Sequence, residues 1–286
     1  MGEIVGAALV SHHPGLFQSD SFRVEAGAGA DSDLISGFDR LRAHIDRVGA
    51  DTLVIFDTHW LTTGFHLVDG GAHYEGTYIS DEMPWYLYGQ EYNYDGAPAL
   101  AAACEQVAKE RRVLAQNIDE PSLTRHYATL NVVKMLRRDE KVLTVGNCQT
   151  AKTKHFLEMG EVVGEAIRRT DCRAVLLASG ALSHKFNDLD WEQANPRIFH
   201  QDNISSPSNR ERDFEAIALF EQGRHDLILD RFEQYRALPW EGLGGHYLQM
   251  IGALGGGRCA AKGERLSDYE NARGTGNIHI WFEVNE

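Results

Sequence analysis

Cysteine is scarce in this chain, and its placement argues against both disulfides and thiolate metal sites. The 286 residues include four cysteines, namely Cys104, Cys148, Cys172 and Cys259. They are far apart, with no CxxC pair and no short-spaced cluster with histidine, and no secretory leader precedes the first predicted strand. Scattered cysteines of this kind are typical of reduced, mostly buried thiols, so we expect a cytoplasmic protein.

Long apolar runs and excess positive charge are also lacking. The longest apolar stretches, such as AVLLASGAL at residues 174–182, are too short to span a bilayer, so we expect no membrane association. The chain has 42 acidic and 28 basic residues, a formal net charge of -14, and no concentrated basic patch. A polyanion would be repelled by this balance, and we expect no nucleic-acid partner.

What the sequence does contain is an alternation of buried strands with amphipathic helices. We predict strands at residues 4–11, 51–59, 141–148 and 173–184, and helices at 33–49, 99–112 and 155–170. The length and the 43% hydrophobic content suffice for one large core. This alternation indicates an α/β fold with helices on both faces of a central sheet.

The last third of the chain departs from the alternation. We predict helices at residues 210–223, 225–235 and 244–256, and a closing strand at 277–284, within a mixed sheet. Residues 187–209 are polar and are predicted to form a long surface excursion, a kind of segment that often serves as a lid or contact loop. Residues 1–286 are therefore predicted to form a single domain.

Histidines follow three of the predicted strands, in SHHP at 11–14, DTHW at 57–60 and GALSH at 180–184. Ligands of open α/β sheets bind beyond the carboxyl ends of the strands, so polar side chains there carry functional weight. His12 or its neighbour His13, with His59 and the carboxylate Glu241, would supply the two imidazoles and one carboxylate that hold ferrous iron in non-heme oxygenases. Chemistry alone does not choose between His12 and His13, and one histidine after a strand is usually only a polar cap.

Longer segments resemble a known family. SHHP, VIFDTHWL, SLTRHYATL, VLLASGALSH, the Glu-Gly pair at 241–242 and the closing GTGN occur in the order found in LigB-type (class III) extradiol ring-cleaving dioxygenases. The resemblance runs from about residue 4 to the final predicted strand, and it implies one LigB-like catalytic domain. It implies that Fe(2+) is bound by His12, His59 and Glu241. It also implies that His184 is an acid/base residue beside the substrate and not a ligand.

The main departure from the family lies in RHYATL at residues 125–130. Many members carry a His-Gly pair in this loop, whereas this chain has Tyr127, as in the homoprotocatechuate and aminophenol branches. We predict that the Tyr127 hydroxyl is catalytic and donates a hydrogen bond to a substrate oxygen or a bound oxygen species. His126 is a competing candidate for this role, and ring packing is the competing interpretation of Tyr127. His126, His246 and His13 are predicted to contact the substrate, although each is also a plausible surface or supporting histidine.

The resemblance implies an oxidoreductase of aromatic catabolism. Such an enzyme brings a small aromatic substrate and O2 together at ferrous iron, inserts both oxygen atoms into a catecholic ring, and yields a muconic semialdehyde. The favoured substrate is 3,4-dihydroxyphenylacetate, and 1,6-cleavage of 2-aminophenol on the same scaffold stays open. A zinc-dependent hydrolase and a non-catalytic binding subunit are the remaining alternatives. We expect the protein to form a homo-oligomer.

Overall fold

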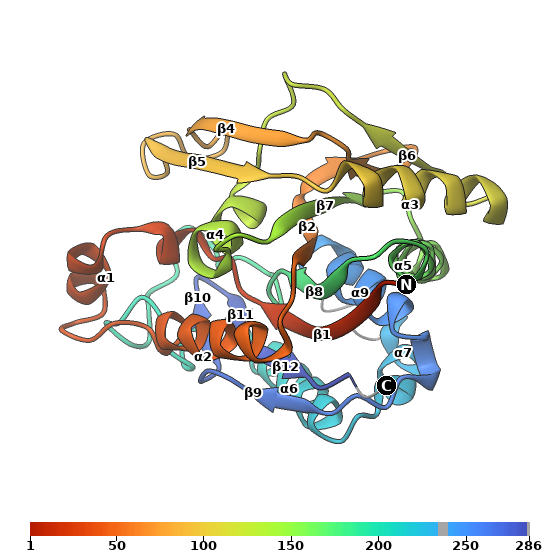
Figure 1. Ribbon diagram of the computed structural model, residues 1–286. Helices are drawn as coiled ribbons and strands as arrows, with labels where there is room; N and C mark the ends of the chain where they lie inside the picture. The colour runs from red at the N-terminus through yellow and green to blue at the C-terminus, as the bar shows by residue number, and fades with distance from the viewer. Residues whose placement is uncertain (234–239, 285–286) are drawn as a thin grey trace.

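The computed structural model describes residues 1–233 and 240–284, and its centre is an eight-stranded sheet (Figure 1). The order of the strands in this sheet is β6-β3-β7-β2-β8-β1-β12-β9. The strands along the chain are β1 (Glu3–Val10), β2 (Thr52–Thr62), β3 (His66–Asp69), β4 (His73–Tyr78), β5 (Gln90–Asp95), β6 (Ala115–Ile118), β7 (Lys141–Cys148), β8 (Arg173–Ser179), β9 (Gly263–Arg265), β10 (Glu270–Ala272), β11 (Thr275–Asn277) and β12 (Ile280–Phe282).

The helices pack around this sheet, and the sequence predicted most of them to within a few residues. The α-helices are α1 (Asp20–Ala26), α2 (Asp33–Val48), α3 (Pro98–Arg111), α4 (Tyr127–Leu136), α5 (Thr153–Arg169), α6 (Pro207–Glu221), α7 (His225–Asp230) and α9 (Gly245–Ala253), and the 3-10 helices are η1 (Pro14–Phe17), η2 (Glu241–Gly244) and η3 (Gly256–Arg258). The helix predicted at 225–235 ends at Asp230, and residues 234–235 lie outside the described residues.

The sheet is mixed, as predicted. Its centre consists of β7, β2, β8 and β1, which pair in parallel. On one side, β3 pairs antiparallel with β7 and parallel with the edge strand β6. On the other side, β12 pairs antiparallel with both β1 and β9. The parallel strands therefore all end at one side of the molecule, where the candidate site lies.

Two apolar cores lie on opposite faces of the sheet, because side chains alternate between the faces along each strand. In β2, Val54 and Phe56 pack into the core that contains the buried faces of α3, α5 and α9. Leu53 and Ile55 point the other way, into the core formed with α2 and α4. A strand with both faces covered is apolar throughout, which explains the continuous apolar run LVIF.

Several elements were not predicted. The β4–β5 hairpin, drawn in orange at the top of Figure 1, forms a separate two-stranded sheet. Most of its residues are at least partly exposed, so its sequence lacks a regular apolar pattern. Placing Tyr127 in a loop was wrong, since it is the first residue of α4. Most of α4 is buried and no side chain caps its start, so neither a polar face nor a start signal identifies it.

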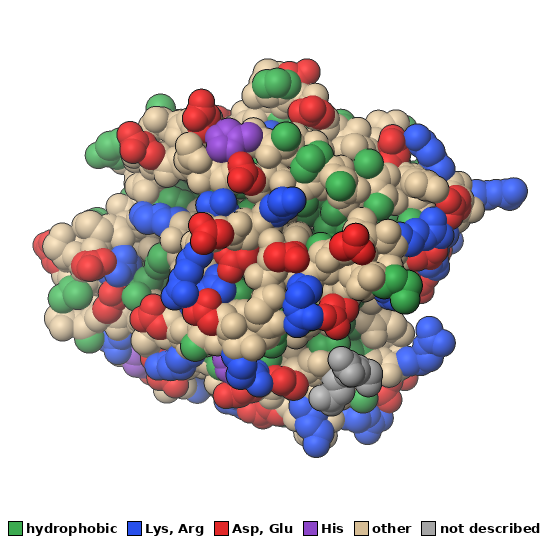
Figure 2. Space-filling view, in the orientation of Figure 1, with side chains coloured by type: hydrophobic (Ala, Val, Ile, Leu, Met, Phe, Trp, Pro, Cys, Tyr) green, Lys and Arg blue, Asp and Glu red, His purple; other side chains and the backbone are tan. Residues whose placement is uncertain are grey.

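Within the described residues, no helix has both the length and the apolar character needed to cross a membrane. All four cysteines are free. Cys104 and Cys148 are buried, and Cys172 and Cys259 are partly exposed. On the face shown in Figure 2, acidic and basic side chains are intermixed and do not form one large patch of either sign.

Candidate metal centre and active site

The first candidate ligand, His12, lies two residues beyond the end of β1 and is 3% exposed. Its Nδ1 is 2.8 Å from the Oγ of Ser179, the last residue of the neighbouring strand β8. The Ser179 hydroxyl donates its own hydrogen to the carbonyl of Ala128, at 2.8 Å. Ser179 Oγ therefore accepts from His12 Nδ1–H, and this network assigns the free lone pair of the ring to Nε2.

The second candidate ligand, His59, lies inside β2 at an irregularity of the sheet. The pairing of β2 with β7 shifts register between Phe56 and Leu61, which is a bulge. Asp57 satisfies the backbone there, because its Oδ1 accepts hydrogen bonds from the amides of His59 and Trp60 at 2.7 and 2.8 Å. Bulges beside active sites re-aim side chains. Here the bulge accompanies the turn of His59 toward the cavity, where its Nδ1 lies 3.2 Å from Glu82 Oε1.

The third candidate ligand, Glu241, begins the short helix η2 in a backbone that is unusual for a helix. The next three residues, Gly242, Leu243 and Gly244, all have positive φ angles, of 56°, 60° and 71°. The amide of Glu241 donates to the carbonyl of Leu182 at 3.1 Å, which ties it to the segment after β8. Its carboxylate accepts from the Ala181 amide at 2.6 Å and from Thr58 Oγ1 at 3.0 Å.

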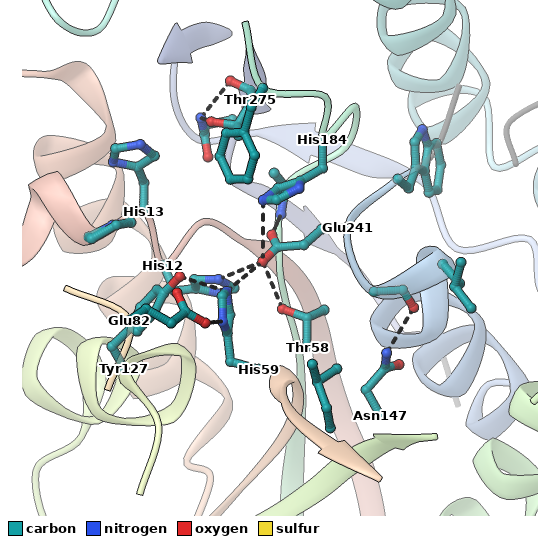
Figure 3. A pocket seen from close by; sticks show the side chains of 18 of the residues that line it. His12, His13, Thr58, His59, Glu82, Tyr127, Asn147, His184, Glu241 and Thr275 are labelled. Atoms are coloured by element: carbon teal, nitrogen blue, oxygen red, sulfur yellow. Dashed lines mark hydrogen bonds and ion pairs between the residues drawn. The ribbon is translucent and has the colours of Figure 1, made fainter. Parts of the chain in front are cut away.

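These three side chains converge on one point (Figure 3). Glu241 Oε1 is 3.0 Å from both His12 Nε2 and His59 Nε2, and one potential ligand atom from each residue lies within 4.8 Å of the others. Burial by itself raises the pKa of the Glu241 carboxyl, but His12, His184 and the hydrogen bonds from His12 and His59 hold it well below its ordinary value. The site therefore contains an ionised carboxylate.

The donor set fits a divalent metal ion. A proton on Nε2 of either histidine makes its 3.0 Å contact with Glu241 a hydrogen bond to the carboxylate. In the neutral tautomer with Nδ1–H directed at Ser179 or Glu82, each Nε2 instead offers a lone pair, and a bound cation would take the place of the proton. One ligand atom from each residue lies within 4.8 Å of the others, close enough to bind a single ion. The arrangement is thus the two-histidine, one-carboxylate set that the sequence predicted.

His184 lies beside this cluster and outside it. It comes five residues after the end of β8, and its Nε2 is 3.9 Å from Glu241 Oε1. The side chain is 25% exposed and lies against the ring of Phe186, with ring centroids 4.8 Å apart. The strand predicted at 173–184 ends at Ser179, so His184 belongs to an irregular segment that pairs with Thr275 through one bridge.

Tyr127 reaches the same point from α4. Its hydroxyl is 2.7 Å from His59 Nε2, and its ring lies 4.2 Å from the His59 ring between centroids. Burial, followed by the charges of Glu241 and Glu82, raises the pKa of the Tyr127 phenol far above its ordinary value. The hydroxyl therefore remains a hydrogen-bond donor at neutral pH, next to a candidate ligand atom.

A cavity of about 690 Å³ opens onto the cluster. This volume is in the range of pockets for small organic ligands. Its wall is mostly apolar and carries a few polar groups. The apolar and polar wall residues outside the cluster include Leu61, Met83, Phe186, Trp240, Leu243, Asn147, Gln149 and Asn277.

The other three predicted substrate contacts occupy different positions. His13 lines the cavity, and burial lowers its pKa to about 3, so its imidazole is neutral. His126 lies beside Asp57 and Arg125 in a separate small pocket. His246 is buried, with its ring against Gly180, and it is not among the wall residues. A direct substrate contact stays a prediction for His126 and His246, without support from their positions.

Sequence reasoning missed the residues that orient the cluster. Ser179, Asp57 and Glu82 each contact a candidate histidine, and Asn147 donates from Nδ2 to the carbonyl of Gly242 at 3.0 Å. Ser179 is the last residue of β8, and Asp57 lies two residues before His59 inside β2. Their closeness in sequence to the predicted strand ends and histidines is the signal that could have identified them. Glu82 lies between β4 and β5 in a segment without a strand or helix, where the sequence carries no comparable signal.

The chain is similar to curated ring-cleaving dioxygenases. The chain is 26% identical over 259 residues to 3,4-dihydroxyphenylacetate 2,3-dioxygenase of Escherichia coli, a match that covers 89% of this chain and 91% of the relative. It is 25% identical over 297 residues to the 2-aminophenol 1,6-dioxygenase beta subunit of a Pseudomonas species, with 99% and 95% covered.

Among solved structures, the fold resembles that of an uncharacterized protein from Escherichia coli K12, with a TM-score of 0.64 and 14% sequence identity. That match covers 97% of this chain and 99% of the other, and at this identity it supports the fold alone. Residues 6–283 match the family described as the catalytic LigB subunit of aromatic ring-opening dioxygenase. Because this match spans nearly all of the sequence, the chain belongs to the LigB family.

Proposed function

We propose that this protein is a non-heme Fe(II) extradiol dioxygenase that opens a catecholic ring with O2. The observation that carries the proposal is the convergence of His12, His59 and Glu241 at the mouth of a cavity, in a chain of the LigB family. Two imidazoles and one carboxylate are the ligands that non-heme iron oxygenases use, because they leave coordination positions open for substrate and oxygen.

His12, His59 and Glu241 would hold the iron through Nε2, Nε2 and a carboxylate oxygen. When bound there, ferrous iron supplies open positions at which a catechol and O2 meet and exchange electrons. The residues around it keep the ligands in place. Ser179 and Glu82 fix the two imidazoles in the tautomer that a metal requires, and Thr58 and the Ala181 amide hold the carboxylate.

His184 is proposed as the acid/base group. Its Nε2 lies 3.9 Å from Glu241 Oε1, beside the cluster, and from there it can take a proton from a substrate hydroxyl and return one to a departing oxygen. The Tyr127 hydroxyl, which stays protonated, would donate a hydrogen bond to a substrate oxygen bound beside His59. His13 is proposed as a contact on the cavity wall.

The proposed substrate is 3,4-dihydroxyphenylacetate, which would give a muconic semialdehyde carrying both atoms of O2. This choice rests on the relative named for that reaction. Cleavage of 2-aminophenol is the second candidate, because a relative that matches 99% of this chain is named as a subunit of the 1,6-dioxygenase. Both substrates carry a heteroatom substituent on each of two adjacent ring carbons, so the same ligand set serves either.

Oxygen uptake tests reaction class and substrate together. The protein is loaded anaerobically with ferrous ion and supplied with 3,4-dihydroxyphenylacetate, catechol, protocatechuate or 2-aminophenol, while an oxygen electrode and the absorbance of the ring-opened product are followed. We expect one O2 consumed per ring opened, with 3,4-dihydroxyphenylacetate fastest. Zinc-loaded protein and the Glu241→Ala variant serve as controls. A test ester is also supplied to the zinc-loaded protein. Hydrolysis of this ester by the zinc-loaded protein, together with no oxygen uptake by the iron-loaded protein, would establish the hydrolase alternative.

The same experiment addresses the non-catalytic alternative. A binding subunit would take up a catechol and consume no oxygen until an unlike subunit is added.

The homo-oligomer is a proposal that size-exclusion chromatography with light scattering tests directly. The cytoplasmic location likewise rests on the scattered, free cysteines.

A further inference from the structure

A buried carboxylate outside the cavity holds the segment that carries His184. Asp213, on α6, is fully buried. Its Oδ1 accepts a hydrogen bond from the Ser183 amide at 3.0 Å. Its Oδ2 accepts from the Ser183 hydroxyl and from the Tyr269 hydroxyl, each at 2.6 Å. The amide and the hydroxyl of Ser183 therefore both donate to the carboxylate of Asp213.

Among the described residues, no lysine or arginine forms an ion pair with Asp213. A buried carboxyl without an opposite charge is costly, and here three donors offset that cost. Burial, opposed by the hydrogen bonds from Ser183 and Tyr269, raises its pKa to about 7. The buried carboxyl of Asp213 therefore needs a structural explanation, and its hydrogen bonds with Ser183 and Tyr269 indicate one.

Other contacts also hold the segment between β8 and His184. The Gly180 amide donates to the carbonyl of Val10 at 2.9 Å, and the Ala181 amide donates to Glu241 Oε2 at 2.6 Å. Ser183 forms a bridge with Trp240. Leu182 donates its amide to the carbonyl of Gly276 at 2.9 Å, and Gly276 returns a bond to the carbonyl of Ser183 at 2.8 Å. Past Ser183, His184 has one bridge to Thr275. Asp213 is the only side chain among the described residues that bonds to both donors of Ser183. Because Ser183 directly precedes His184, these two bonds help to set the direction in which the imidazole leaves the backbone.

We propose that Asp213 is a positioning residue, which acts through Ser183 to keep the imidazole of His184 facing Glu241 and the cavity. The inference rests on the proposed acid/base role of His184. Asp213 is not among the residues that line the cavity, and its effect on turnover passes through the placement of His184. A small displacement of a proton-transfer group is sufficient to slow a reaction by about 100-fold.

The test is a double-mutant cycle on the iron-loaded enzyme. Asp213→Ala and Ser183→Ala are made alone and in combination with His184→Phe, and kcat, KM and bound iron are measured for each. We expect each single alanine variant to lower kcat by about 10- to 100-fold, with KM and iron content changed less than about threefold. In the His184→Phe background the same alanine substitutions should lower kcat no further, because the group they position is gone.

Two further variants separate positioning from general destabilisation. Asp213→Asn keeps the shape and one acceptor for the Ser183 amide, and it should recover most of the kcat lost in Asp213→Ala. Glu140→Gln alters another buried carboxylate, which pairs with Arg42 at 2.7 Å just before β7 and away from the cavity. It should lower the melting temperature and leave kcat unchanged. Should Asp213→Ala not fold, Ser183→Ala carries the same cycle.

The two proposals fail in different ways. Additive losses in the double variants, with His184→Phe alone impaired, would overturn the positioning role and leave the function of His184 intact. A His184→Phe enzyme with normal turnover would overturn the proposed acid/base role itself. Loss of kcat in Glu140→Gln as large as in Asp213→Ala would show that the effect is a general consequence of destabilisation.

Discussion

Replacing Asp213 by asparagine should change how the stability of the protein depends on pH. The folded protein holds this carboxyl at a pKa of about 7, against an ordinary value of 3.8, chiefly because the group is buried. Between these two values the folded state keeps the proton and the unfolded state releases it. The group therefore stabilises the fold at the acid end of this range, and that contribution is lost as the pH rises through 7.

The magnitude follows from the two pKa values. Each pH unit in the interval corresponds to about 1.4 kcal/mol of unfolding free energy, so the Asp213 contribution falls by roughly 2–3 kcal/mol between pH 5 and pH 8. Asparagine does not titrate. The unfolding free energy of the wild type minus that of Asp213→Asn should accordingly decrease by this amount over the same range, whatever its absolute value at pH 5.

Urea unfolding followed by far-UV circular dichroism at pH 5, 6, 7 and 8 measures this difference, with both proteins at the same metal load. Taking a difference removes the contribution of other titrating groups, including the buried histidines that both proteins share. Glu140→Gln is the matched control for the loss of a buried carboxyl group, because the carboxylate it removes is paired with Arg42 and lies away from Asp213. A wild-type minus Asp213→Asn difference that stays constant from pH 5 to pH 8 would refute the reasoning, since Asp213 would then be ionised throughout.

Four further substitutions test the site. Glu241→Ala should reduce bound iron after ferrous reconstitution at least about 10-fold without unfolding the protein, and full occupancy would contradict its role as a ligand. His184→Phe should keep its iron and lose turnover by roughly 10²–10⁴, and iron loss would make it a ligand instead. Tyr127→Phe removes one donor worth ~1–3 kcal/mol and should slow turnover about 5- to 150-fold; unchanged turnover would leave its ring a packing role. Glu82→Gln removes the charged partner of His59 and should weaken iron binding about 10-fold, measured by competition with a chelator; unchanged affinity would mean that the bulge alone orients His59.

The sequence predicted the central strands and the histidines at their ends best, because each of these patterns has a single physical cause. Runs with both faces buried predicted the central strands, and polar residues at their ends predicted His12, His59 and His184 near one another. Glu241 was chosen by resemblance, because nothing in a segment between a helix and a glycine-rich turn indicates which strand end it approaches. Glu241 is far from the histidines in the sequence, and only the three-dimensional fold shows that they are close in space.

Two residues that orient the site, Asp213 and Glu82, were beyond sequence reasoning for a physical reason. Asp213 lies in a helix predicted at 210–223, where an aspartate is usually a solvated side chain. Whether it is exposed depends on the packing of α6 against Ser183 and Tyr269, which are distant in sequence. Glu82 shows the same limit, since its contact with His59 joins an irregular segment to a strand 23 residues away.

The path of the chain into the site has a consequence for how the protein acquires its metal. His12 and His59 lie near the beginning of the chain, whereas Glu241 comes 182 residues after His59 and is followed by three successive left-handed residues. Closing a loop of that length costs chain entropy before the contacts across it can stabilise the fold. The complete ligand set therefore forms late in folding. During synthesis on a ribosome, nearly the whole chain must emerge before a three-ligand site exists. A nascent chain can offer a metal ion no more than the two histidines, and tight capture of iron awaits the finished fold.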